Sequence, residues 1–349
     1  MPHVMQQEAV SVPGAAGAGD LVTPALQLAR LPRLTSARAP LTRAIEAIDE
    51  SGRQQEVCIP AERALTVYVD KRELVTLMTL GAMPELLVLG YLRNQRLVQS
   101  AAEVESITVD WETGAAAVRT RAGISDIERR TARRVVTTGC GQGSVFGGLM
   151  DAVRQLRLPP GRITQSQLYA IVDAMRGQQS TYRAAGSVHG CALFQGEELQ
   201  VFVEDVGRHN AIDTIAGWMW LHSAERDVPG RPADVRPAAP PPGRSPGLRT
   251  PPTVGSPAGP SSGSCTDLVF YTTGRLTSEM VIKAAQMDIA VVVSRSGITQ
   301  MGHAVAQELG LCTIGRALNR RFLCYSGAER LRLETGLVHA RAGVTAARV

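Results

Sequence analysis

The feature that most constrains the fold is an alternation of short apolar strands with helical patterns, which begins near Arg134. The strand patterns include VHGCALF, LQVFVED, DLVFYTT and IAVVV, and helical patterns such as SEMVIKAAQM lie among them. Strands and helices that alternate along a chain pack as layers, with helices covering the faces of a sheet. The sequence therefore predicts a three-layer α/β core with a mixed sheet over residues 126–345.

A smaller region with a different pattern precedes this core. The segment LTVYVDKRELVTLMT predicts a hairpin that turns at Asp70 and Lys71, and VESITVDWETGAAAVRT predicts a second one that turns near Gly114. Pro84 suits the first turn of a helix between the two hairpins. We therefore expect a small N-terminal α+β subdomain over residues 41–125.

Two segments show no periodic pattern. Residues 1–40 are rich in Ala, Pro and Gly, and 11 of the 20 prolines lie between Pro229 and Pro260. Such composition does not bury enough apolar surface to fold. We expect a disordered tail at 1–40 and a disordered insertion at 224–265 within the core.

Charge and cysteine usage exclude several classes of protein. The net charge is only +5 and aromatic residues make up 4% of the chain, which does not favour a nucleic-acid binder. The six cysteines form no close pair, so neither a zinc knuckle nor a disulfide framework is expected. The first residues lack the pattern of a signal peptide, and no apolar run is long enough to cross a membrane. We expect a cytoplasmic protein with reduced thiols and no bound metal.

Cys140 is the cysteine best placed for chemistry. It follows a strand pattern, is bounded by Gly139, Gly141 and Gly143, and precedes an expected helix. A helix N-terminus stabilises negative charge and lowers the pKa of a thiol, which makes the sulfur nucleophilic. The alternative is a small residue that fills a tight turn.

The remaining cysteines show fewer sequence signs of a reactive thiol. We interpret Cys191, Cys312 and Cys324 as ordinary buried thiols on strands, while Cys58 and Cys265 flank disordered or irregular segments.

Two strand-to-helix junctions hold polar residues suited to a ligand. The first is the run from Glu204 to Asn210, which includes Arg208 and His209, and the second is Thr273-Gly274-Arg275. Ligands bind α/β proteins at such junctions, and anions bind at helix N-termini. Plain helix caps, at His209 or Asn210 and at Thr277, are the alternative.

A basic cluster lies in the last strand pair of the chain. Arg316, Arg320 and Arg321 carry guanidinium groups, which bind phosphate through paired N–H donors. The alternative is a solvated surface strand.

These segments, in this order, resemble the FdhD family of sulfurtransferase accessory proteins for formate dehydrogenase. The resemblance runs from about Ala61 to Gly327 and omits the proline-rich insertion. Its most specific part is the octapeptide from Glu204 to Ala211. Further support comes from Thr273-Gly274-Arg275 with the following SEM and Lys283, from the Cys140 loop, and from TLMTLGAMPELLVLGYL.

The resemblance implies a function. A cysteine desulfurase would supply sulfur as a persulfide on Cys140, and the sulfur would pass to the molybdenum of a bis(molybdopterin guanine dinucleotide) cofactor before insertion into formate dehydrogenase. The family's cofactor-contacting stretch matches Arg316, Ala317, Leu318, Asn319, Arg320 and Arg321, with weaker contacts expected from Arg208, His209 and Arg275. The family also implies a cytidine-deaminase-like core, without zinc, and a homodimer.

The sequence departs from the family pattern at three places. Gly143 replaces the second cysteine of a Cys-x-x-Cys loop, Arg316 and Leu318 replace an aromatic and an arginine, and Thr214 replaces a lysine. Cys191 is then a candidate second thiol. Two other functions stay open: a non-catalytic chaperone for the molybdenum cofactor, and a cysteine hydrolase with His209 or His189 as its base.

Overall fold

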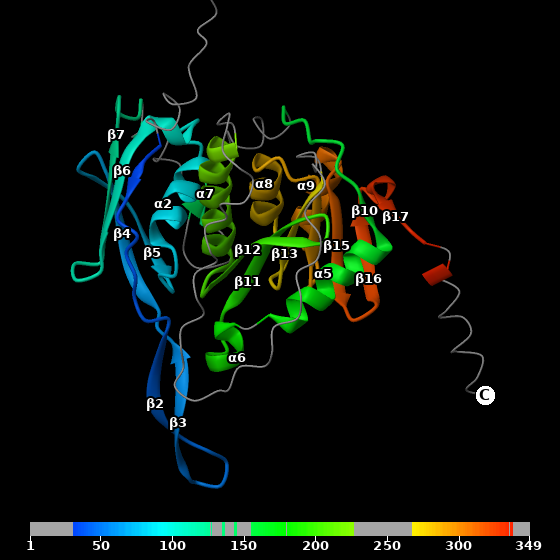
Figure 1. Ribbon diagram of the computed structural model, residues 1–349, viewed down its shortest axis with the longest axis horizontal. Coiled ribbons are helices and arrows are strands. Elements are labelled where there is room, and N and C mark those ends of the chain that lie inside the picture. Colours follow the sequence, from blue (N-terminus) through cyan, green and yellow to red (C-terminus); the bar gives the residue numbers. More distant parts are fainter. Residues whose placement is uncertain are drawn as a thin grey trace, which may run out of the picture.

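The computed structural model describes residues 31–125, 127, 155–178, 180–226, 267–334 and 336–337, with two short strands at 135–136 and 143–144. Two sheets with a helix pair between them dominate the molecule (Figure 1). The predicted insertion lies almost wholly outside the described residues. However, the last helix before it ends at Arg226, inside the segment 224–265 expected to be disordered.

The larger, central sheet has six strands in the order β12-β11-β13-β14-β15-β16. Strands β13, β14 and β15 are parallel, and the other neighbouring pairs are antiparallel, so the sheet is mixed as predicted. The strands are β11 (His189–Gln195), β12 (Glu198–Asp205), β13 (Leu268–Thr272), β14 (Val291–Ser294), β15 (Cys312–Leu318) and β16 (Arg321–Ser326).

Helices cover both faces of the central sheet. On β13, Phe270 packs with the helices on one face, while Val269 and Tyr271 pack on the other. The first face carries α7 (Arg208–Arg226), α8 (Ser278–Gln286) and α9 (Gln300–Leu309), and the second carries α5 (Gln165–Gly177). The predicted three-layer α/β arrangement is confirmed.

Local signals set several helix ends. Thr164 and Gln167 have the Thr-x-x-Gln spacing that predicts a capping box, and their side chains form that capping box at the start of α5. Gly310 ends α9 in the left-handed conformation that favours glycine, with φ of 65°. No helix in the described ranges combines the length and apolar character needed to cross a membrane.

The N-terminal sheet contains both predicted hairpins. Its five strands run in the order β1-β6-β7-β4-β5, and α2 packs on it through a separate apolar core. Asp70 and Lys71 both have positive φ, the conformation of the tight turn that matches strand twist. The elements are β1 (Arg33–Leu34), β4 (Arg63–Val69), β5 (Arg72–Thr79), α2 (Pro84–Asn94), β6 (Val104–Asp110) and β7 (Ala115–Thr120).

Helices α2 and α7 cross between the two sheets with their backbones in contact. A Cβ atom on Gly90 of α2 would overlap the carbonyl oxygen of Asp213, and one on Gly217 of α7 would overlap that of Leu86. Glycine at both positions therefore permits the close approach that joins the two parts of the molecule.

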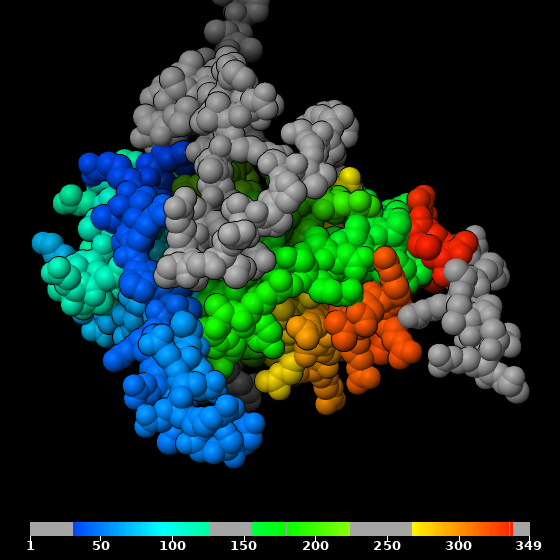
Figure 2. All heavy atoms as spheres, turned by 60° about the horizontal axis from the view of Figure 1, so that its bottom comes forward, coloured from blue at the N-terminus to red at the C-terminus, as the bar shows by residue number. Residues whose placement is uncertain are grey.

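Two features differ from expectation at the N-terminal end. Strand β1 lies inside the segment 1–40 expected to be disordered, and it pairs with β6. Residues 42–60 form a hairpin of β2 (Thr42–Ile48) and β3 (Gln54–Pro60), which projects from the body (Figures 1 and 2). Cys58 is therefore an exposed strand residue, not part of an irregular segment.

The remaining described elements are short. They are β8 (Val135–Val136), β9 (Gly143–Ser144), β10 (Ile163–Thr164), α6 (Thr181–Ala185), β17 (Leu331–Arg332) and the 3₁₀ turns at Ala101–Glu103 and Ala328–Arg330.

Candidate functional site

Three strands of the central sheet end, and a fourth begins, at one side of the sheet, which we call the carboxyl edge. Asp205 ends β12, Thr272 ends β13 and Ser294 ends β14, while β11 begins there with His189. The register places His189 opposite Asp205, and Thr272 opposite Ser294. Strand β15 runs parallel to β14 and extends past this edge into the final hairpin. Both predicted junctions therefore lie on the same edge of the sheet.

Hydrogen bonds hold the loops at this edge together. The Gly190 N–H donates to the Thr273 hydroxyl over 3.0 Å, and the Thr273 N–H donates back to the Gly190 carbonyl over 2.9 Å. Farther along, the Arg316 N–H donates to the Ser296 carbonyl over 2.6 Å. The start of the final hairpin is thus fixed to the loop that follows β14.

Cationic side chains gather at the carboxyl edge. Arg275, Arg295 and Arg316 are exposed, whereas Arg208 is mostly buried. Burial lowers the pKa of His189, and the nearby guanidinium groups of Arg208 and Arg275 lower it further. The electrostatics of the edge therefore favour an anionic ligand.

Gly274 explains how Arg208 reaches its position. A Cβ atom on Gly274 would lie 2.9 Å from Cδ of Arg208, so the aliphatic stem of the arginine packs against the glycine loop. Thr277 is the N-cap residue of α8, as the alternative interpretation expects, but its hydroxyl forms no capping hydrogen bond.

Residues at both ends of the run from Glu204 to Asn210 have structural roles. Glu204 accepts hydrogen bonds from the N–H groups of Thr181 and Tyr182 and so caps α6. Asn210 lies inside α7, and its amide donates to Asp205 over 2.9 Å and to the Met78 carbonyl over 2.7 Å. Asn210 is thus a link between the sheets instead of a helix cap.

His209 belongs to a buried polar cluster beneath the carboxyl edge. Its Nε2 lies 3.5 Å from Oε2 of Glu279, and Lys283 lies 2.8 Å from Asp213 and 3.5 Å from Glu279. Asn94 also donates to Asp213, over 2.7 Å. The five side chains come from α2, α7 and α8, so the cluster joins three helices.

Burial sets the charge states in this cluster. Burial lowers the pKa of His209 to about 3, with a further contribution from Lys283, so the imidazole is neutral at pH 7. Burial alone would lower the pKa of Lys283, but Asp213 and Glu279 raise it above its ordinary value. Among the described residues, Nδ1 of His209 has no hydrogen-bond partner.

The residues of the Arg316–Arg321 hairpin differ in how far their side chains are exposed. Ala317 is buried in the core, which excludes its side chain from ligand contact, while Leu318 is 47% exposed. Arg316 and Asn319 have left-handed φ values of 51° and 55°. The guanidinium groups of Arg316 and Arg321 have no partner in the described part of the chain.

Arg320 differs from Arg316 and Arg321, because side chains of α5 contact it. Its guanidinium lies 3.0 Å from Asp173 and 4.8 Å from the ring centre of Tyr169, and the Tyr169 hydroxyl donates to its carbonyl. Arg176 donates to Asn319 over 2.6 Å. Sequence reasoning missed these residues of α5, since only the fold brings them to the hairpin.

Cys140 lies outside the described residues. The strands on either side of its loop, β8 and β9, pair antiparallel, with Val136 opposite Gly143. The loop is therefore followed by a strand residue, and the expected helix does not begin directly after it.

The other described thiols have distinct environments. Cys191 is fully buried, and burial raises the pKa of its thiol to about 12, so it does not serve as a second nucleophile at neutral pH. Cys312 and Cys324 lie on strands as predicted. A hydrogen bond from the Cys312 thiol lowers the pKa of the Cys324 thiol to about 7.

No group of three or more His, Cys, Asp or Glu within the described ranges could hold a metal ion.

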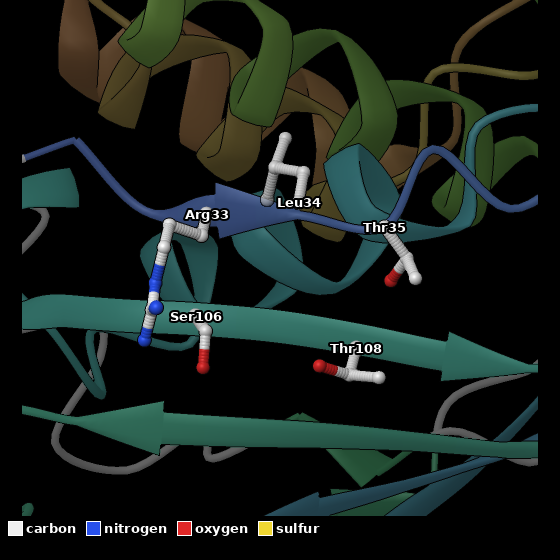
Figure 3. Close-up of a pocket in the computed structure, with 5 residues that line it drawn as sticks. All are labelled: Arg33, Leu34, Thr35, Ser106 and Thr108. Atoms are coloured by element: carbon white, nitrogen blue, oxygen red, sulfur yellow. The ribbon is translucent and has the colours of Figure 1, made fainter.

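A shallow hollow of about 320 Å³ lies on the N-terminal sheet, away from the carboxyl edge. Arg33, Thr35, Ser106 and Thr108 face it, and Leu34 completes its lining (Figure 3). None of the residues selected from the sequence lines this hollow.

Comparisons with known proteins cover the segments that contain both junctions. The FdhD/NarQ family model matches residues 60–228 and 260–332. The sulfur carrier protein FdhD of Bacillus licheniformis is 28% identical over 279 residues, covering 80% of this chain and 91% of the relative. The FdhD protein of Bacillus subtilis is 26% identical over 277 residues, covering 78% and 89%.

A solved structure supports the fold. It is that of a Desulfotalea psychrophila protein to which an accessory role for formate dehydrogenase is assigned. It aligns with a TM-score of 0.60 at 20% identity, covering 84% of this chain and all of the other. The family match spans both junctions and the final hairpin, and the chain belongs to the FdhD/NarQ family.

Proposed function

We propose that this protein is a sulfur carrier that serves formate dehydrogenase. Cys140 receives sulfur from a cysteine desulfurase as a persulfide. The outer sulfur then passes to the molybdenum of a bis(molybdopterin guanine dinucleotide) cofactor before the cofactor is inserted. In this step the S–S bond breaks, a thiol reductant supplies two electrons, the sulfur leaves as sulfide and Cys140 returns to its thiol form. Family membership and the sulfur-carrier names of the relatives support this proposal.

The loading step is a thiol exchange. The Cys140 thiolate attacks the outer sulfur of the desulfurase persulfide, the S–S bond of the donor breaks, and the desulfurase cysteine leaves as a thiolate. The Cys140 thiol loses its proton to solvent before the attack. This step needs an accessible sulfur of low pKa, for which a glycine-bounded loop is suited.

The observation that best supports cofactor binding is the placement of Arg208, Arg275 and Arg316 along the same carboxyl edge. The cofactor is the cargo of the reaction and carries two pyrophosphate groups. Several guanidinium groups at one edge of a sheet suit such a polyanion. His189 at the same edge stays neutral, because burial and the two arginines lower its pKa.

We also propose that the core is related to cytidine deaminases but holds no zinc, and that the protein acts as a cytoplasmic homodimer. The three helical and sheet layers support the first statement. His189 is followed by Gly190 and Cys191, so it lacks the glutamate of a zinc deaminase motif.

A mass measurement tests the sulfur-carrier function. The protein is incubated with a cysteine desulfurase and L-cysteine, and peptides are searched for one added sulfur atom. We expect the addition at Cys140, its loss in Cys140→Ala, and no loss in Cys58→Ala, which removes an exposed thiol elsewhere. A wild-type protein without persulfide on Cys140 would contradict the mechanism.

Gly143 in place of the second loop cysteine favours one alternative, a cofactor chaperone without sulfur transfer. Formate dehydrogenase activity distinguishes the two in cells that lack their own copy of the gene. Activity that survives Cys140→Ala favours the chaperone, whereas its loss favours the sulfur carrier.

A further inference from the structure

Helix α5 contacts the turn of the final hairpin through the charged side chains of Asp173 and Arg176 and through Tyr169. Asp173 lies 3.0 Å from the Arg320 guanidinium, and Arg176 donates to the Asn319 side chain over 2.6 Å. Tyr169, one turn before Asp173, lies under the Arg320 guanidinium at 4.8 Å. Figure 1 shows α5 running obliquely across the strands that carry this turn.

This contact separates Arg320 from the other arginines of the hairpin. Arg316 and Arg321 present guanidinium groups that no described residue pairs, whereas Arg320 already holds a carboxylate. A carboxylate and a phosphate offer the same kind of oxygen acceptors to a guanidinium. Asp173 therefore takes the place on Arg320 that an anionic ligand would use.

We propose that Asp173 is a positioning residue that holds Arg320 in the unliganded protein and is displaced when a phosphate group of the cofactor binds the hairpin. The inference rests on the proposed function, because that function supplies the phosphate-bearing ligand. Tyr169 keeps the Arg320 backbone in place during the exchange, since its hydroxyl bonds the Arg320 carbonyl over 3.3 Å.

The strength of the ion pair suits such an exchange. The side chains of Arg320 and Asp173 are 57% and 43% exposed, so solvent screens their attraction. A pair of this kind lowers the affinity of a competing ligand for Arg320 by about two- to fivefold. A pyrophosphate group, which carries two negative charges, can then displace Asp173 by a change of side-chain partners alone.

Guanosine diphosphate serves as the probe, and its dissociation constant is measured by calorimetry at low salt on the full chain. We expect Asp173→Asn to bind the probe about two- to fivefold more tightly, and Asp173→Glu, which keeps the carboxylate, to bind like wild type. Uncharged guanosine should show no difference between the variants. Glu105→Gln, which breaks the exposed Arg33–Glu105 pair of the other sheet, is the matched control and should leave binding unchanged.

A double-mutant cycle tests whether Asp173 acts through Arg320. In an Arg320→Ala background, Asp173→Asn should no longer tighten binding. If wild type binds the probe and Asp173→Asn binds equally or more weakly, this inference is wrong while the proposed function stands. If neither wild type nor Asp173→Asn binds the probe, both the inference and the proposed cofactor site are wrong.

Discussion

The Asp205 carboxylate, at the end of β12, accepts a hydrogen bond of 2.5 Å from the hydroxyl of Thr79, at the end of β5 in the other sheet. The N–H groups of Leu80 and Gly207 and the amide of Asn210 donate to the same carboxylate. Burial raises the pKa of Asp205, while these donors oppose the shift. The most specific motif of the sequence therefore ties the central sheet to the N-terminal sheet.

Replacing Asp205 should destabilise the fold strongly. Asp205→Ala leaves several buried donors without an acceptor, so we expect the free energy of unfolding to fall by about 2–4 kcal/mol. Thr79→Val removes one of these hydrogen bonds and should cost about 1 kcal/mol. Urea denaturation measures both. Asp110→Ala, at an exposed turn, is the control, and an equal loss in that variant would contradict the assigned role.

Methyl groups at the α2–α7 crossing should separate the helices. Gly90→Ala places a Cβ atom onto the Asp213 carbonyl, and a backbone atom yields little, so we expect a loss above about 3 kcal/mol or failure to fold. Gly177→Ala, in a helix position with open space, should be neutral or slightly stabilising. Thermal melting compares the two, and similar melting temperatures would show that the crossing is loose.

Cys191 should resist thiol reagents. Its pKa of about 12 and full burial leave almost no accessible thiolate at neutral pH. We expect brief treatment with iodoacetamide to alkylate exposed Cys58 and to spare Cys191, as measured by peptide mass spectrometry. Cys191→Ala should still form the Cys140 persulfide. Rapid alkylation of Cys191 in the folded protein would contradict its low reactivity and make it a candidate second thiol again.

Acid should destabilise the protein through His209. The pKa of its imidazole is 6.5 unfolded and about 3 folded, so below pH 6.5 the unfolded state takes up a proton that the folded state does not. The free energy of unfolding therefore falls as pH decreases between those values. From pH 6.5 to pH 5, wild type should lose about 1.5 kcal/mol more than His209→Gln. Parallel pH profiles of the two proteins would rule out a neutral, buried His209.

Local signals in the sequence predicted much of the fold. The Thr164–Gln167 capping box, Gly310 at the end of α9 and the Asp70–Lys71 turn each depend on residues close along the chain. The β2–β3 hairpin was missed because both its faces are largely exposed, so its strands lack the alternation that marks a half-buried strand.

The candidate site was only partly predictable. The sequence marked Arg208, Arg275 and the Arg316–Arg321 stretch, and their placement at one edge follows from strand direction. Neither the role of Asn210 as a link to Met78 nor the grip of Asp173 on Arg320 follows from neighbours in the sequence. Those contacts depend on which segments the folded chain brings together.

The backbone contact of α2 with α7 limits how this molecule can move. Gly90 and Gly217 lie against opposing carbonyl groups, so a change in the angle between the helices would push backbone atoms into one another, and we expect little hinge motion between the two sheets. The hydrogen bond from Thr79 to Asp205 is a second connection between the two sheets. Under the proposed function, uptake and release of the cofactor would then depend on small rearrangements of loops and side chains at the carboxyl edge, and the two connected sheets would keep those loops in register.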